Sequence, residues 1–362
     1  MPRGWNDSGN DFVKKRAVVI GNGAQGLAAA WKLLDTGMFE VEVVADKAGL
    51  SPPNALWEIP PYNVQPEVLV TKWAKATFGE YLSMRESFGE DVGVCYPVPL
   101  YALTRNELPG DHPQKHNLAN YRHGPEVLKE EILQRATAGT AHEIYKDAEA
   151  YDTITVNTRK NFAWLRKRIQ ELGGRFSRVE LKDLSEAWTV GDRGKVDLVV
   201  NCTGMGAYDL AKDKAVKPIK GQVVHVSMDE VRCAMSDYES RSYAIPADGE
   251  WLEVGGTSEE GVWDRAPDQA ILDDLVNRAS EMLPRLKEVM KSDDADVWTG
   301  LRPGREGGVR FGIDKSRAKG EPVVIHCYGH GGAGVITSLG CANDVAALAI
   351  DALQIIQSKS KL

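Results

Sequence analysis

The chain has 362 residues, 43% of them hydrophobic and 27% charged, a balance that excludes a largely disordered protein. At this length we expect two domains whose core needs no disulfide or metal for support. The net charge of −8, without a basic stripe, argues against nucleic acid and anionic membranes as partners, and no apolar run approaches the roughly 18 residues of a membrane-spanning helix.

The first predicted unit is a strand, a glycine-rich turn and a helix. Residues 16–20 are rich in β-branched side chains and predict a buried strand, which GNGAQG (21–26) follows at once. Residues 27–37 predict a helix, and residues 41–45 predict a second strand that ends at Asp46. In this context a GxGxxG sequence binds the pyrophosphate of a dinucleotide, and the acidic residue accepts hydrogen bonds from a ribose. The pattern does not distinguish NAD from FAD.

Each glycine of this turn has an expected task. Gly21 allows the tight turn out of the strand, Gly23 lets the backbone approach a pyrophosphate, and Gly26 lets the helix pack closely. The helix N-terminus then offers free N–H groups to the phosphates.

The middle of the chain changes character twice. Residues 63–150 contain proline clusters and no further strand–helix–strand repeat, which predicts an inserted, partly antiparallel region. The dinucleotide-binding half is expected to resume with strands and a helix, and short strands of antiparallel type follow. The strands are expected at 151–160, 175–181, 196–204, 221–228, 242–247 and 251–257, and helices at 161–172 and 266–289.

These elements predict an α/β fold, a Rossmann-like cofactor domain with an interleaved α+β substrate domain built on a mostly antiparallel sheet. We expect the cofactor domain to be discontinuous, over residues 1–62, 150–218 and 298–362. The substrate domain is then expected over residues 63–149 and 219–297.

A second glycine-rich junction lies near the C-terminus. Residues 323–328 predict a strand, GHGGAG (329–334) follows, and a long helix comes next. One interpretation is that the glycines only let this helix pack tightly. The other is that the helix N-terminus faces the ring system of the cofactor, where its dipole stabilises negative charge.

Few residues outside the glycine-rich turns suggest chemistry by themselves. Arg302 precedes a proline and is a candidate for bidentate binding of a carboxylate, while Tyr238, Arg241 and Tyr243 either line a pocket or fill the core. The chain has no GxSxG, HExxH or Walker A sequence. The five cysteines form no CxxC pair, so we expect no metal site and a reducing compartment.

Taken together, these segments resemble the D-amino acid oxidase family of FAD enzymes, including its eukaryotic peroxisomal members. The segments that carry the resemblance are VVIGNGAQGLAAA (18–30), NALW (54–57), VVNCTG (199–204) and VIHCYGHGGAGVITSLGCA (324–342). The last of these is specific to the family, whereas many FAD and NAD proteins share the first. The resemblance is weakest in residues 63–150.

The resemblance implies a set of site residues. Arg302 matches the arginine that binds the substrate carboxylate, Tyr243 the tyrosine that hydrogen-bonds it, Tyr238 lies one residue off a lid tyrosine, and Gly332 stands beside the flavin ring. The implied FAD contacts are Gly21, Gly23, Ala24, Gln25, Gly26, Asp46, Lys47, Ser51, Ala55, Leu56, Val179, Thr203, Gly204, Arg302, Gly331, Gly332, Ala333, Gly334, Val335 and Thr337.

The activity implied by the resemblance is FAD-dependent oxidative deamination of D-amino acids, with hydride transfer from Cα to flavin N5 and reoxidation by O₂ to hydrogen peroxide. Members specific for D-aspartate carry an arginine after Gly-Gly-Thr, where this chain has Ser258, Glu259 and Glu260. We therefore expect neutral or basic substrates, and Arg241 is the residue that could reverse this. The alternatives are a D-aspartate oxidase, a glycine or sarcosine oxidase, an NAD-dependent dehydrogenase and a flavoprotein without turnover.

The last residues predict a location. Ser360-Lys361-Leu362 matches the tripeptide that the peroxisomal import receptor reads. An oxidase that releases peroxide has a physical reason to be in a peroxisome, so we expect this compartment. A homodimer is a further expectation.

Overall fold

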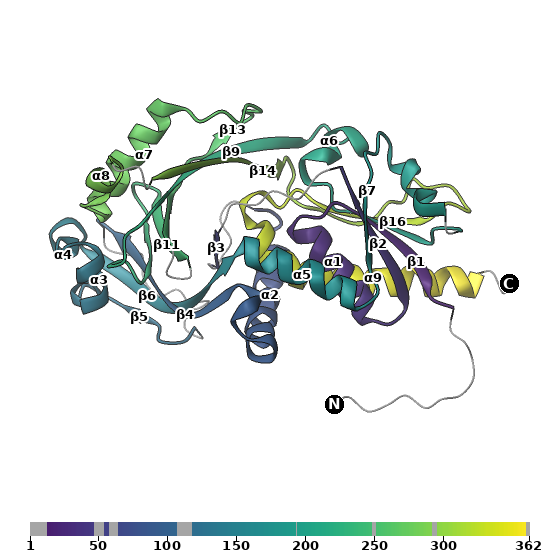
Figure 1. The fold of residues 1–362 in the computed structure, drawn as a ribbon, viewed down its shortest axis with the longest axis horizontal. Coiled ribbons are helices and arrows are strands. Elements are labelled where there is room, and N and C mark those ends of the chain that lie inside the picture. The colour runs from purple at the N-terminus through teal and green to yellow at the C-terminus, as the bar shows by residue number, and fades with distance from the viewer. Residues whose placement is uncertain are drawn as a thin grey trace.

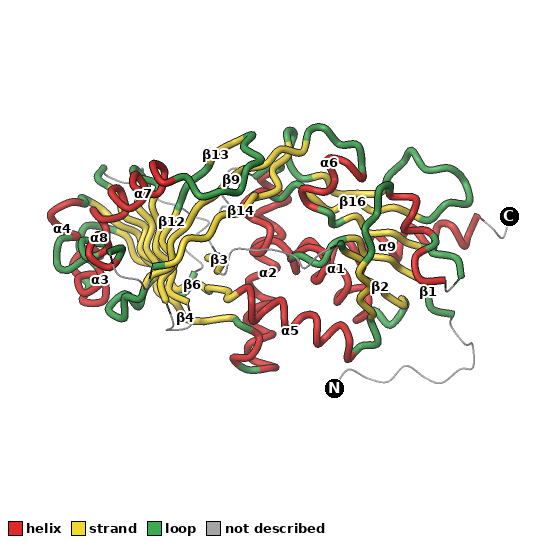
Figure 2. Tube along the Cα trace, turned by 45° about the horizontal axis from the view of Figure 1, so that its top comes forward, coloured by secondary structure: helices red, strands yellow, loops and turns green. Residues whose placement is uncertain are grey.

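The structure is a computed structural model that describes residues 13–46, 54–57, 64–106, 118–192, 194–247, 251–291 and 295–359. Within these residues the chain forms two sheets, each with its own set of helices (Figures 1 and 2). The two glycine-rich junctions belong to the first sheet, and the short antiparallel strands belong to the second.

The first sheet has six strands, and all of its pairs are parallel except that of β15 with β16. Its order is β15 (Arg310–Ile313), β16 (Val323–Tyr328), β8 (Leu198–Asn201), β1 (Lys15–Ile20), β2 (Phe39–Ala45) and β7 (Arg175–Arg178). The central strands are rich in valine because both faces of a parallel sheet are covered. One face packs on α1 (Ala24–Asp35), α5 (Thr158–Glu171) and α9 (Gly334–Lys359), and the other on a short helix, Leu184–Trp188.

The second sheet has ten strands, and its pairs are antiparallel except that of β10 with β4. Its main path is β13 (Glu259–Glu260), β9 (Val216–Val226), β12 (Trp251–Gly255), β11 (Ser242–Ala247), β10 (Ala234–Asp237), β4 (Val94–Thr104), β6 (Asp147–Asn157) and β3 (Asn54–Leu56). Off this path, β14 (Asp296–Arg305) pairs with β9, and β5 (Arg122–His123) pairs with β6. Figure 2 shows helices gathered on its outer side, namely α3 (Glu131–Ala136), α4 (Ala141–Ile144), α7 (Gln269–Met282) and α8 (Leu286–Val289).

Most of the predicted elements are present, and the helix predicted over 266–289 is divided at Pro284 into α7 and α8. The largest unpredicted element is α2 (Glu67–Phe88), a 22-residue helix inside the region expected to be partly antiparallel. It packs against α9, and its inward side chains recur at helical spacing. These are Val70, Trp73, Ala74, Thr77, Tyr81 and Met84.

The sheets divide the chain at positions that differ from the expected domain boundaries. β3 and β14 belong to the second sheet, although residues 1–62 and 298–362 were assigned to the cofactor domain. Helix α2 packs in the core of the first sheet, although it falls within 63–149. Strands β9 and β14 are long and run from the second sheet toward the first (Figure 1), which places their ends beside the glycine-rich turns.

Among the residues that the structure describes, one helix is long and apolar enough to cross a membrane by length and composition, contrary to the expectation from the sequence. It spans Gly331–Gln354 and corresponds to most of α9. Within the protein, 67% of that window is buried, and the helix packs against α1 and α2. A buried core helix passes the same test, so the segment is weak evidence for a membrane span.

Candidate active site

The glycine-rich turn GNGAQG follows the end of β1. This strand lies between β2 and β8, so the chain continues to one side of β1 with β2 and returns on the other side with β8, which makes the end of β1 the point where the strand order reverses. In doubly wound sheets this position is the ligand crevice. A Cβ on Gly21, whose φ is +107°, would lie 2.4 Å from the carbonyl oxygen of Cys202, and one on Gly26 would lie 1.8 Å from that of Gly21. Both glycines are therefore required by close backbone packing.

Gly23 differs from these two glycines. A Cβ there would meet no atom of the described residues within 4 Å, so the space in front of it is open. Gly23 is also the N-cap of α1, and no side chain caps that helix end. Open space beside uncapped N–H groups at a helix N-terminus fits the pyrophosphate of a dinucleotide. The close packing predicted for Gly21 and Gly26 is present, and the pyrophosphate contact of Gly23 stays a prediction.

The residues expected at the adenosine end lie together. The backbone N–H of Val179 donates to the carbonyl of Ala45 at 3.0 Å, and Arg178 Nε donates to the carbonyl of Asp46 at 3.0 Å. Val179 thus stands beside the end of β2, where Asp46 follows. Lys47, also expected there through the family resemblance, and Ser51, another implied FAD contact, lie outside the described residues.

The second glycine-rich junction lies next to the first. Gln25 Nε2, in the first turn of α1, donates to the carbonyl of Gly334 at 2.8 Å and to Thr337 Oγ1 at 3.4 Å. The side chains of Ala333 and Thr337 are buried, and the Thr337 hydroxyl donates to the Ala333 carbonyl at 2.7 Å. Cofactor contacts at these two positions would therefore use the main chain. The N-terminus of α9 faces the same crevice, as the second interpretation of this junction requires.

The other expected cofactor residues surround the crevice. Thr203 follows β8, and its hydroxyl donates to Asn201 Oδ1 at 2.7 Å. Gly204, with a φ of +55°, approaches the ring of Pro303 on β14. Ala55 and Leu56 form part of β3, where they pair with Val156 and Thr155 of β6.

Arg302 and Tyr243 meet in a cradle made of glycines. Arg302 Nη1 donates to the carbonyl of Thr257 at 2.9 Å. A Cβ on Gly221 would lie 2.3 Å from the same guanidinium, and one on Gly255 would lie 2.2 Å from the Tyr243 ring. The two side chains thus lie flat against strands that leave room for them. The resemblance expected both at one carboxylate, and the fold brings them together.

Two further contacts complete this cradle. The Arg302 guanidinium lies close enough to the Tyr243 hydroxyl to oppose the rise of its pKa, and a Cβ on Gly332 would lie 3.4 Å from Arg302 Cδ. Gly332 belongs to the second glycine-rich junction, so the cradle and the cofactor crevice are contiguous. The site therefore combines an arginine suited to a carboxylate with a space suited to a dinucleotide.

Burial raises the pKa of Tyr243 above its usual value, the Glu253 carboxylate adds to this rise, and Arg302 opposes it. The phenol therefore stays protonated at physiological pH and can donate a hydrogen bond. Glu253 is itself buried and lies 3.3 Å from His225, also buried.

Sequence reasoning missed Trp298. Its indole covers Gly300, where a Cβ would lie 2.1 Å from the ring. Trp298 and Gly300 lie on the same face of β14 as Arg302, because side chains two positions apart in a strand point the same way. That alternation could have identified Trp298 as a wall of the cradle.

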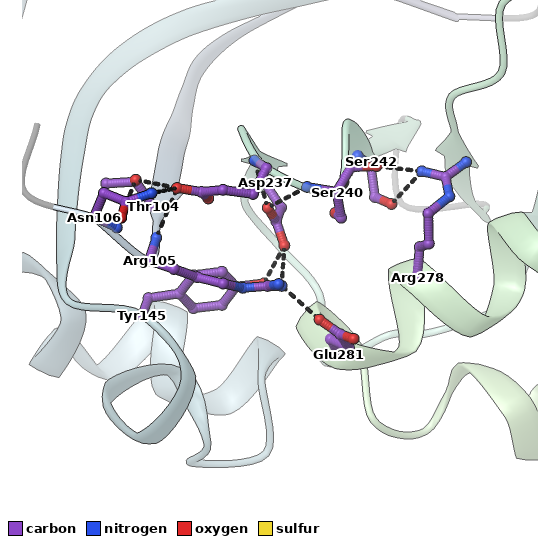
Figure 3. A network of polar contacts seen from close by, with 10 residues as sticks. Thr104, Arg105, Asn106, Tyr145, Asp237, Ser240, Ser242, Arg278 and Glu281 are labelled. Carbon is purple, nitrogen blue, oxygen red and sulfur yellow. Dashed lines mark hydrogen bonds and ion pairs between the residues drawn. The ribbon is translucent and has the colours of Figure 1, made fainter.

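Tyr238 stands on the four-residue turn between β10 and β11, and its backbone N–H donates to the Leu103 carbonyl at 3.1 Å. Polar contacts hold this turn on both sides (Figure 3). On one side the buried Asp237 carboxylate accepts from Arg105 at 2.8 Å and from the Tyr145 hydroxyl at 2.8 Å. On the other, Arg278 donates to the Ser240 carbonyl. The structure thus places Tyr238 on an anchored turn, and its expected lid role stays a prediction.

Comparison with known proteins agrees with this site. A family model described as FAD dependent oxidoreductase matches residues 16–348. The D-amino-acid oxidase of Rubrobacter xylanophilus is 33% identical over 350 residues, which cover 94% of this chain and 98% of the relative. The D-amino-acid oxidase of Streptomyces coelicolor is 28% identical, covering 92% and 96%. These bacterial relatives match at higher identity than the 26% of the Dictyostelium discoideum enzyme, so the expected closeness to eukaryotic peroxisomal members is not what the comparison shows.

Solved structures share the fold at lower identity. The glycine oxidase of Geobacillus kaustophilus has a TM-score of 0.74 at 20% identity, covering 93% of this chain and 95% of that one. The L-proline dehydrogenase of P. horikoshii has a TM-score of 0.73 at 17% identity, covering 94% of each chain. The glycine-lined crevice, the adjacent arginine and the family match over nearly the whole chain lead to one conclusion: the chain belongs to the DAO family of FAD dependent oxidoreductases.

Proposed function

We propose that this chain oxidises free D-amino acids to 2-oxo acids and ammonia, with FAD as cofactor and O₂ as acceptor, and releases hydrogen peroxide. The observation that carries the proposal is the Arg302–Tyr243 pair, which adjoins Gly332 of the cofactor crevice. The bacterial relatives named D-amino-acid oxidase support the same reaction.

The pair suits the carboxylate that every amino acid carries. A guanidinium has five N–H donors. Arg302 donates one of them to the Thr257 carbonyl, and this hydrogen bond orients the guanidinium plane. The remaining donors can take a carboxylate in bidentate fashion, and the protonated Tyr243 hydroxyl adds a third hydrogen bond. Two anchors on one end of a small substrate restrict its orientation, and such restriction is a major source of rate enhancement.

FAD, held at the two glycine-rich junctions, would supply the redox chemistry, namely hydride acceptance from Cα and electron transfer to O₂. The imino acid that leaves the site would be hydrolysed by water to the 2-oxo acid and ammonia. The residues of this chain orient the substrate and exclude water. Trp298 closes one side of the cradle, and glycines at 221, 255 and 332 let the strands and the loop approach Arg302 and Tyr243. No side-chain base is required if the amine enters in its neutral form.

The charges around the site favour substrates with a neutral or basic side chain. Glu259 and Glu260 form β13, which begins two residues after Thr257, and the buried Glu253 carboxylate acts on Tyr243. Negative charge on these elements opposes an acidic substrate side chain. D-Aspartate is the second candidate, because the D-aspartate oxidase of Homo sapiens is 29% identical over 215 residues and Arg241 lies on the anchored turn.

The test is peroxide release from the purified, FAD-loaded chain over a panel of D- and L-amino acids with glycine and sarcosine. The proposal expects turnover of neutral and basic D-amino acids, with D-alanine and D-arginine well above D-aspartate. Turnover confined to L-amino acids, or faster with glycine or sarcosine than with any D-amino acid, would reject it.

The location and the oligomeric state are proposals as well. Ser360-Lys361-Leu362 lies outside the described residues, and we propose that it directs peroxisomal import. A fluorescent protein ending in the last ten or so residues should enter peroxisomes, and the same fusion without the final tripeptide should remain outside. A homodimer stays a prediction that light scattering can test.

A further inference from the structure

Three side chains of types that can bind a metal ion lie close together beside the cofactor crevice. They are Cys327 at the end of β16, His330 in the second glycine-rich junction and Cys341 in α9. Their ligand atoms all lie within 4.8 Å of one another, and all three residues are buried. Cys327 Sγ lies 3.4 Å from Cys341 Sγ. The sequence has no CxxC pair and predicted no metal site, but the fold gathers these residues from a strand, a loop and a helix.

Cys202, directly after β8, lies beside Cys327 and its thiol interacts with that of Cys327. The ligand atoms that converge are those of Cys327, His330 and Cys341. Because the Cys202 carbonyl is the one that requires a glycine at position 21, the three ligands lie next to the first glycine-rich turn as well as within the second.

His330 provides an independent observation. Only 2% of this residue is exposed, and its Nε2 atom is buried without a hydrogen-bond partner among the described residues. A buried imidazole nitrogen without a partner costs free energy, and such groups in native proteins usually mark an ion, a water or a function. A cation held by the neighbouring thiols would supply the missing partner.

We propose that Cys327, His330 and Cys341 bind one thiophilic cation, Zn²⁺. Sulfur and imidazole donors are the ligands that structural zinc sites use. With Zn–S bonds of about 2.3 Å and Zn–N bonds of about 2.0 Å, the edges of a tetrahedral site are roughly 3.5 to 3.8 Å long. The observed separations, from 3.4 Å to no more than 4.8 Å, need only small side-chain adjustments.

Binding at this site has defined consequences. Each thiol that coordinates the cation loses its proton to solvent, and the imidazole binds in its neutral form. The cation would join β16 to α9 through His330, which precedes Gly331. It would thus act as a structural staple of the second glycine-rich junction, without taking part in amino acid oxidation.

The test measures metal content of the full FAD-loaded chain from zinc-supplemented cultures, after gel filtration with a weak chelator. The wild type should retain about one zinc per chain, and Cys341→Ala should retain almost none. Cys233→Ala is the matched control, because Cys233 is equally buried but lies in the core of the second sheet, and it should retain zinc as the wild type does. Cobalt in place of zinc should give thiolate-to-metal charge-transfer absorption in the wild type and in Cys233→Ala, but not in Cys341→Ala.

Three results would overturn the site: a folded wild type without zinc, equal zinc in wild type and Cys341→Ala, or a Cys327–Cys341 disulfide in the purified protein by mass spectrometry. Circular dichroism and flavin content report whether each variant folds, and His330→Ala replaces Cys341→Ala if that variant does not. Metal content is read without any substrate, so its outcome is separate from that of the proposed oxidase function.

Discussion

Gln25 and Gly334 are 309 positions apart, yet the Gln25 side-chain amide donates to the Gly334 carbonyl at 2.8 Å. The same side chain accepts a hydrogen bond from Cys327. One glutamine thus connects the helix that follows the first glycine-rich turn to the helix that follows the second. Two helix N-termini therefore face one crevice, which suits a ligand with a diphosphate at one end and an electron-accepting ring at the other.

Replacing Gln25 by alanine should loosen this connection. The variant leaves the Gly334 carbonyl without its donor, at a cost of about 1 kcal/mol. We expect FAD to bind about 5- to 10-fold more weakly, measured by fluorescence titration of the apoprotein. Gln170→Ala, at an exposed position of α5, is the control and should bind FAD as the wild type does. Equal affinity in all three proteins would contradict the role given to Gln25.

Arg302→Met should act mainly on substrate binding. Hydrogen bonds to charged groups contribute about 1.5 to 3 kcal/mol, so kcat/KM for D-alanine should fall at least 10- to 100-fold, largely through KM. Arg302→Lys should recover little of this loss, because an ammonium lacks the planar fork. Arg232→Ala removes an exposed arginine and should leave the kinetics unchanged. Unchanged kinetics in Arg302→Met would remove Arg302 from the site.

Tyr243→Phe should have a smaller effect with a specific pH signature. Because burial raises the pKa of Tyr243, the hydroxyl is protonated throughout the usual assay range. The loss in kcat/KM should therefore be constant from neutral pH to about pH 10, the usual pKa of a phenol. Profiles of kcat/KM against pH check this. A loss confined to either end of that range would mean that Tyr243 titrates during the reaction.

The two glycines at the start of α1 should respond differently to alanine. Gly23→Ala places its Cβ in open space, so the protein should fold normally but bind FAD weakly. Gly21→Ala meets the Cys202 carbonyl and has a φ of +107°, so it should lower the midpoint of thermal unfolding of the apoprotein. Gly79→Ala, at a solvent-exposed position in the middle of α2, should leave the unfolding midpoint unchanged or raise it slightly. Similar losses of FAD affinity and stability in both turn variants would contradict this separation.

Asp213 should make stability depend on acid pH. Burial acts to raise the pKa of Asp213, but hydrogen bonds from Arg305, Tyr328 and the Ala215 backbone outweigh it and hold the pKa at about 2. The folded pKa lies below that of the unfolded chain, so the stabilisation is present above about pH 4 and is lost as pH falls through about 2.

Asp213→Asn tests this dependence. At pH 7 the variant should be less stable than the wild type by about 2 kcal/mol in chemical unfolding, and the difference should shrink toward pH 2. Asp209→Asn alters an exposed aspartate and should change little at either pH. A difference that is independent of pH would show that the charge of Asp213 is not what stabilises the fold.

Local patterns predicted the first sheet well. The valine-rich strands, the GxGxxG turn and the glycine-rich junction before α9 each follow from short-range chemistry, and the structure contains all three. Arg302 and Tyr243 were paired through the family resemblance. Their glycine cradle depends on how β9, β12 and β14 align, and a single sequence does not give that register.

Other features depend on contacts between distant segments. Helix α2 has the helical spacing of apolar residues, but the prolines around it suggested strands and turns instead. The cysteines at 202, 327 and 341 have no motif spacing, because they come from different elements and meet only in the fold. Residues 298–305 lie in the second sheet, because β14 pairs with β9 along its whole length and still delivers Arg302 to the crevice.

The most direct measurement is the absorption spectrum of the FAD-loaded protein under anaerobic conditions, with D- and L-amino acids added one at a time. The account predicts that D-alanine and other neutral or basic D-amino acids bleach the flavin band, that their L-enantiomers do not, and that admitting O₂ restores it. A flavin that no D-amino acid reduces, or that L-amino acids reduce equally well, would contradict the account.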